Sequence, residues 1–136
     1  MGTWGAASFE NDDAVDWLAD LSQSTDLRPI QAALEAVTRL DSASYLEAPE
    51  ASAAVAAAEV VAAVLGRPAA NLPREVTTWL DAHRQLAVSD DLRTTAQRAV
   101  ARVQAGSELR ELWDESGDAG ATWREQLSDL MTRLAG

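Results

Sequence analysis

The chain of 136 residues contains no cysteine, no lysine and a single histidine, His83. Without cysteine there is no disulfide framework, no thiolate metal site and no cysteine nucleophile. A single histidine excludes a paired-histidine zinc motif, and the sequence shows no glycine-rich phosphate loop. Carboxylates alone can perform acid–base chemistry, but these absences together favour a protein without hydrolase, nuclease or other catalytic activity.

A long apolar run is also missing. The most apolar stretch, 51–65, is too short to span a bilayer and contains Glu59. The start shows no basic flank followed by an apolar run, and Ala6 stands where a myristoylation motif has Ser or Thr. We therefore expect a cytoplasmic protein that neither spans nor binds a membrane.

Positive charge is scarce, because 11 arginines stand against 22 acidic residues and leave a net charge of −11. A strongly acidic chain is repelled by phosphate backbones and by anionic membrane surfaces. The charge therefore argues against nucleic acid and membrane partners and favours a basic protein partner.

Strand signals are nearly absent, since no run of β-branched or aromatic residues alternates with period two. Apolar residues instead recur at the i, i+3, i+4, i+7 spacing of amphipathic helices. The pattern predicts an all-α fold: one domain, 1–136, formed by an irregular bundle of about seven helices with an extended N-terminal segment packed on it. A chain of this length can bury a core without disulfides.

Capping residues, prolines and glycines set the expected helix ends. The helix between Pro49 and Leu65, which Gly66 ends, is apolar almost all round and is predicted to lie at the centre of the bundle. The other helices are expected to begin at Asn11 or Asp12, at Thr25 or Asp26, at the Asn71-Leu72-Pro73 turn, and at Ser89, Ser107 and Thr122. The expected loops are 41–48 and 117–120. The side chains of Tyr45, Leu46, Leu112 and Met131 are expected to point inward.

Residues 1–17 are the most distinctive stretch. They contain Met1, Gly2, Trp4, Gly5, Phe9, Asn11, Asp12, Ala14, Asp16 and Trp17. This arrangement resembles the opening of a bacterial family, the domain of unknown function numbered forty-two fifty-nine, with Ala7 in place of the family's third glycine. The resemblance continues through 71–73 and 107–113 and implies a shared fold, but the family brings no established activity. It implies a structural role for the motif residues Trp4, Gly5, Phe9, Asn11, Asp12 and Trp17.

The acidic residues near the N-terminus are the candidate functional residues. No basic residue occurs in 1–26, and Asp13, Asp16 and Asp20 share one face of the first expected helix. A basic partner could bind there, a hard cation such as Mg²⁺ or Ca²⁺ is an alternative, and simple solvation is a third reading. No calcium-loop spacing is present, so we assign no metal site and no cofactor. Asp16 adjoins Trp17 at the edge of the core, where we expect it to have a hydrogen-bond donor.

The remaining polar residues are expected to have structural or solvent-exposed roles rather than functional ones. His83 is expected to be a partly buried core histidine with one satisfied nitrogen. Glu59 and Ser52 are expected to form a narrow solvent-exposed edge of their helix, because a buried Glu59 would need an arginine from another helix. Arg93, Arg98 and Arg102 form a basic surface that could pair with the acidic first helix or meet a partner, and that is solvated by default. The tryptophans are expected in the core rather than around a ligand.

These features favour a non-enzymatic protein-interaction module, such as an immunity or antitoxin-like inhibitor of a basic partner. The alternative is a small-ligand or metal-dependent enzyme that uses the N-terminal acidic cluster. A purely structural subunit is the third hypothesis.

Overall fold

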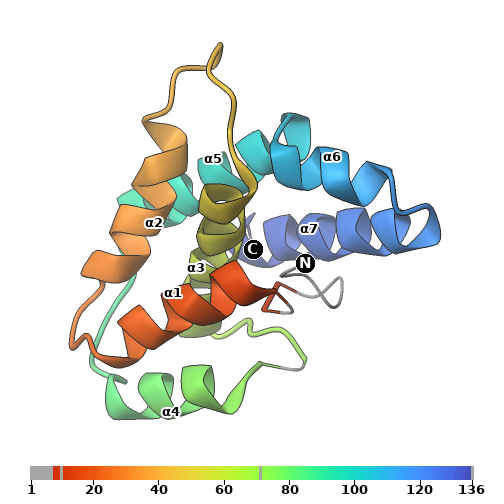
Figure 1. The fold of residues 1–136 in the computed structure, drawn as a ribbon. Coiled ribbons are helices and arrows are strands. Elements are labelled where there is room, and N and C mark those ends of the chain that lie inside the picture. Colours follow the sequence, from red (N-terminus) through yellow and green to blue (C-terminus); the bar gives the residue numbers. More distant parts are fainter. Residues whose placement is uncertain (1–7, 10, 71, 136) are drawn as a thin grey trace.

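The computed structural model describes residues 8–9, 11–70 and 72–135. These residues form a bundle of seven helices and no β-strand (Figure 1): α1 (Asp12–Ser22), α2 (Arg28–Thr38), α3 (Ala48–Val64), α4 (Arg74–Ala82), α5 (Asp90–Ala105), α6 (Glu108–Asp114) and α7 (Asp118–Ala135). The predicted all-α helical bundle is confirmed. Most of the expected N-terminal segment, residues 1–7 and 10, lies outside the described residues.

Helix α3 is the centre of the bundle, as predicted. It packs against α1, α2, α5, α6 and α7, and its side chains are buried on every face from Val55 to Ala62 (Figure 1). Its many alanines favour the helix and let the neighbouring helices approach closely. No helix in the described part of the chain combines the length and the apolar composition that a bilayer crossing requires.

Both ends of α3 are fixed by specific contacts. At its start, the Glu108 carboxylate of α6 accepts a hydrogen bond of 2.7 Å from the Ala48 N–H. At its end, Gly66 has a φ of 87°, and the Arg67 N–H bonds to the Ala62 carbonyl at 2.9 Å. A left-handed glycine that follows a helix in this way satisfies carbonyls that would otherwise lack partners.

Helix α1 starts at the predicted cap. The Asn11 side chain accepts a hydrogen bond of 2.8 Å from the Ala14 N–H. The buried face of the helix consists of Ala14, Trp17, Leu18 and Leu21. The Trp17 indole N–H donates to the Pro29 carbonyl at 3.3 Å and thereby links α1 to the first turn of α2.

The prediction that Thr25 or Asp26 caps α2 is wrong. The N-cap is Leu27, and Asp26 accepts instead from the Arg28 N–H at 3.0 Å, which is a local turn. Pro29 in the first turn explains the difference. Its ring fixes a helical φ and it has no N–H that needs a cap.

The expected start of the last helix is also wrong. Helix α7 begins at Asp118, and the Thr122 hydroxyl lies inside it and donates to the Asp118 carbonyl at 3.3 Å. The sequence predicts a loop over 117–120, but the turn is made by Gly117 alone, which has a φ of 61°. Gly120 is already helical and packs directly on the Trp113 carbonyl of α6, where a Cβ would have no room.

Two side chains expected to point inward, Tyr45 and Leu112, lie at the surface. Tyr45 is 59% exposed because its hydroxyl donates to the Glu111 carboxylate at the surface of α6. Leu112 is 42% exposed, whereas Met131 is partly buried and packs against the core, as predicted. Leu46 is buried, as predicted, and its carbonyl accepts from the Glu108 N–H at 2.8 Å.

Candidate functional site

The acidic residues of α1 lie on its outer side. Asp16 and Asp20 are exposed and Asp13 is half-buried. Helix α1 contains no basic residue, and no described residue forms an ion pair with any of these three carboxylates. The donor expected for Asp16 is therefore not found in the described part of the chain.

The basic surface of α5 does not meet α1. Helix α5 packs on α2, α3 and α7. Arg93 lies 4.0 Å from Asp90 on its own helix, and Arg102 donates to the Ser44 carbonyl at 2.6 Å. Arg93 and Arg102 therefore contact groups near their own helix and not the acidic face of α1.

The negative charges near the start of α1 affect one another. Burial raises the pKa of the Asp13 carboxyl, and the charges of Asp16, Asp12 and Glu50 raise it further. Glu50 belongs to the first turn of α3, so the acidic surface extends across two helices. The sequence pattern did not reveal this contribution, because it depends on how α1 and α3 pack.

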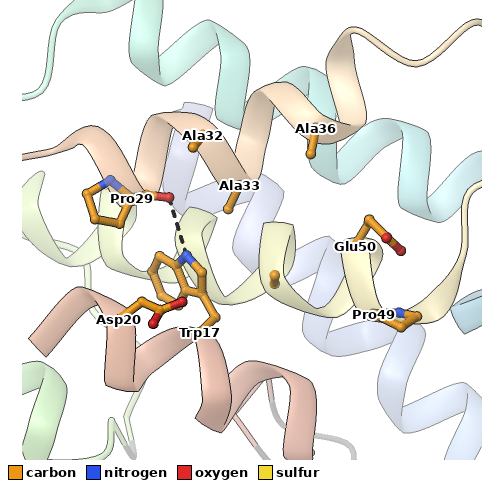
Figure 2. Close-up of a pocket in the computed structure, with 9 residues that line it drawn as sticks. Trp17, Asp20, Pro29, Ala32, Ala33, Ala36, Pro49 and Glu50 are labelled. Atoms are coloured by element: carbon orange, nitrogen blue, oxygen red, sulfur yellow. Dashed lines mark hydrogen bonds between the residues drawn. The ribbon is translucent and has the colours of Figure 1, made fainter.

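A groove with a volume of about 400 Å³ adjoins this surface (Figure 2). We call it the alanine groove; its lining consists of Trp17 and Asp20 from α1, Pro29, Ala32, Ala33 and Ala36 from α2, and Pro49, Glu50 and Ala53 from α3. Asp20 lies beside the Trp17 indole, and Glu50 lies toward the other end (Figure 2). The floor is apolar and two of the lining side chains are acidic, so the groove suits an apolar ligand that carries positive charge.

The motif residues within the described ranges lie in or beside the core and the start of α1. Phe9 and Trp17 are part of the hydrophobic core, and Asn11 is buried and caps α1. Asp12 is exposed in the first turn of α1, where a carboxylate interacts favourably with the helix N-terminus. Trp4 and Gly5 lie outside the described residues.

The prediction of a solvent-exposed edge on α3 at Ser52 and Glu59 is wrong. Glu59 is 1% exposed and Ser52 is 2% exposed. The Glu59 carboxylate accepts from Arg133 Nη1 at 2.7 Å and Nη2 at 3.2 Å, and the Ser8 hydroxyl donates to it at 2.7 Å. Two charges and a hydroxyl that satisfy one another explain how a carboxylate can lie inside this apolar helix.

Arg133 is held from several sides. Its Nε donates to Asp129 at 2.8 Å, and the side chain is 12% exposed. Burial lowers the pKa of Arg133, but the hydrogen bonds and negative charges of Glu59 and Asp129 outweigh burial and raise it. The resulting network of Ser8, Glu59, Arg133 and Asp129 joins the N-terminal segment, α3 and α7.

The tryptophans with described positions lie in the core or pack against it, as expected. Trp79 and Trp123 are buried, and Trp123 stacks with the half-buried Trp113. His83 stacks on Trp79, and its Nδ1 lies 2.7 Å from the Trp79 carbonyl. His83 is thus the partly buried histidine with one satisfied nitrogen that the sequence predicts.

Among the residues with described positions, no group of three or more His, Asp or Glu side chains is arranged to hold a metal ion. The acidic stripe Asp13, Asp16 and Asp20 is therefore an extended surface in the structure rather than a converging set of ligands. The alternative of a metal-dependent enzyme stays a prediction.

Comparison with known proteins yields a family but no activity. No curated protein and no solved structure matches the chain. A family described as "Domain of unknown function (DUF4259)" matches residues 2–126. The match covers most of the chain, including the acidic face of α1 and all three helices that line the alanine groove. The chain belongs to the DUF4259 family.

Proposed function

We propose that this protein is a non-enzymatic interaction module that binds a basic protein through the acidic face of α1. The observation that carries the proposal is the set of carboxylates of Asp13, Asp16 and Asp20, which lie on a helix without basic residues and have no ion-pair partner among the described residues. By contrast, seven arginines in the described part of the chain lie within 4.0 Å of a carboxylate: Arg28, Arg39, Arg84, Arg93, Arg110, Arg124 and Arg133.

The placement of these acids supports a role in binding rather than in stability. Asp20 lies in the last turn of α1, where no basic residue is present. A negative charge at that end of a helix is unfavourable by about 0.3–1 kcal/mol, because the helix dipole is negative there. The raised pKa of Asp13 likewise reflects a position where negative charge is disfavoured. A cationic partner would relieve both effects.

The finer form of the proposal is an inhibitor of the immunity or antitoxin type. Such a protein acts by covering a basic surface of its target, which requires complementary charge and no catalytic residues. The net charge of −11 and the open acidic face support this form.

The test compares two triple variants with the same loss of charge. The first variant carries Asp13→Asn, Asp16→Asn and Asp20→Asn. The matched control carries Glu75→Gln, Asp91→Asn and Glu125→Gln, at exposed positions on α4, α5 and α7. The probe is a short arginine-rich peptide, and the dissociation constant is measured by calorimetry at low salt.

We expect the α1 variant to bind the peptide between about threefold and about 150-fold more weakly than wild type, since each exposed charge pair contributes about 0.2–1 kcal/mol. The control should bind nearly as tightly as wild type. Equal weakening in both variants would mean that the peptide responds to overall charge, and the proposed site on α1 would then be abandoned.

A further inference from the structure

We propose that the alanine groove receives an α-helix of the basic partner, with an apolar stripe of that helix on α2 and an arginine paired with Asp20. This inference rests on the proposed function and adds to it the shape of the ligand. It predicts that the partner presents a helix, not merely a positively charged surface.

The length of the hollow surface favours a helix. A second hollow, of about 430 Å³, shares Ala32 and Ala36 with the alanine groove and continues along α2 to Arg39 and Leu40. From Pro29 to Leu40 the combined surface follows α2, which ends at Thr38, and the two residues after it for about 16 Å, at about 1.5 Å per residue. That length corresponds to roughly three turns of a helix laid beside α2.

The side chains along this surface are small where a solvated helix usually carries polar groups. Ala32 and Ala36 are exposed and lie one turn apart on α2, and Ala33 and Ala53 line the groove with them (Figure 2). Small side chains allow two helix axes to come close and let larger apolar side chains of a partner fill the hollow. The buried apolar area would supply the affinity that exposed charges alone do not.

The charges beside the groove determine the sign of the partner. The Trp17 indole is held in place by its hydrogen bond to the Pro29 carbonyl, and Asp20 lies beside the ring (Figure 2). An arginine of the partner can pair with Asp20 beside the largely buried indole, which adds an ion pair to the apolar contact with the groove. Glu50 offers a second carboxylate toward the other end. The matching ligand is an amphipathic helix with arginines flanking its apolar stripe.

The experiment uses the full chain and a panel of designed helical peptides. Each peptide has an alanine–leucine stripe flanked by two arginines, set one or two turns apart, and each is compared with a scrambled peptide of the same composition. The groove variant carries Ala32→Gln and Ala36→Gln, which lengthen two exposed side chains without changing charge. The matched control carries Ala101→Gln and Ala105→Gln, two exposed alanines at the same spacing on α5.

We expect at least one amphipathic peptide to bind wild type at least tenfold more tightly than its scrambled form. The groove variant should lose that advantage, and the α5 control should keep it. Asp20→Asn with Glu50→Gln should weaken binding of the same peptide while leaving the melting temperature at or above that of wild type.

Three results would overturn the inference. If wild type never prefers an amphipathic peptide to its scrambled form, the groove does not recognise a helix. If the groove variant binds like wild type while the triple α1 variant does not, the acidic face binds partners and the groove plays no part, so the proposed function stands alone. If wild type self-associates in sedimentation and the groove variant is monomeric, a second copy of the chain occupies the groove.

Discussion

At the scale of single residues, the pairing of Glu59 with Arg133 is the most demanding feature of the core. Glu59 lies in α3, the central helix of the bundle. Its carboxylate accepts hydrogen bonds from Arg133 and Ser8. Removing two charges from water costs several kcal/mol per ion, and the attraction between them repays that cost only when the geometry is good. The two hydrogen bonds from one guanidinium group to one carboxylate provide that geometry.

Replacing Arg133 with Met should therefore lower the free energy of unfolding by about 3–5 kcal/mol, because a buried carboxylate is left without a counter-ion. Urea denaturation measures the loss. The double variant Glu59→Met with Arg133→Met should recover most of it, since two apolar side chains of similar volume then replace the pair.

Arg124→Met serves as the control, because its pair with Asp114 is half-exposed and should contribute about 0–1 kcal/mol. An Arg133→Met protein as stable as the Arg124→Met protein would show that the buried pair does not stabilise the fold.

The hydroxyl of Tyr45 offers a second test at this scale. Desolvation raises its pKa, and the hydrogen bond to Glu111 and the charges of Glu111, Glu108 and Glu47 raise it further, from 10.0 to about 12. Tyr45 is the single tyrosine of the chain, so the near-ultraviolet absorbance of its phenolate reports this group alone. Glu111→Gln should move the titration back toward its ordinary value. An unchanged titration curve would mean that the loop does not hold Tyr45 against α6.

Local signals were enough to predict several residue roles. The caps Asn11, Ser89 and Ser107 act on amide groups three residues ahead, so the sequence nearby contains all the information needed. The partner of Glu59 lies 74 residues away, and no local spacing indicates it. For the same reason the stripe on α1 was predictable, whereas Glu50 and the alanine groove were not, because they depend on how α1, α2 and α3 pack.

At the scale of helices, the corner between α6 and α7 shows how a glycine can decide where a helix starts. Thr122 and Glu125 match a capping box, but the turn closes earlier, at Gly117, which has a φ of 61°. The helix can then continue past Gly120 because that residue has no Cβ to collide with the Trp113 carbonyl. A glycine that permits close approach and a glycine that ends a helix look alike in a sequence, which is why the start of α7 was placed too late.

Gly120→Ala should destabilise the protein by about 1–3 kcal/mol, since the added methyl group forces α6 and α7 apart. Gly106→Ala is the matched control: Gly106 has an extended backbone with open space around its Cα, so the change should be neutral or slightly stabilising. Thermal unfolding of both variants gives the comparison. Equal melting temperatures would show that α6 can move away from α7 at no cost.

At the scale of the whole molecule, negative charge is distributed unevenly. Asp16 is exposed, has Asp13 and Asp20 three and four residues away on α1, and forms no ion pair among the described residues. Each like-charged neighbour at this spacing is unfavourable by about 0.2–0.5 kcal/mol. The acidic face thus lowers the stability of the isolated protein.

Asp16→Asn should accordingly raise the melting temperature of the isolated protein at low salt. The gain should shrink at high salt, where screening already weakens the repulsion. Melting curves at two ionic strengths measure both effects. A variant less stable than wild type at low salt would instead indicate that Asp16 has a donor.

The network around Glu59 also affects how the chain can fold during its own synthesis. Arg133 leaves the ribosome 74 residues after Glu59, a delay of roughly 4–15 s at about 5–20 residues per second. Until Arg133 has been added, the Glu59 carboxylate lacks its guanidinium partner. Since a buried carboxylate without a counter-ion is unfavourable by several kcal/mol, we expect Glu59 to stay hydrated and the bundle to pack fully only after α7 joins it. A chain that exposes apolar surface during this interval is prone to aggregation.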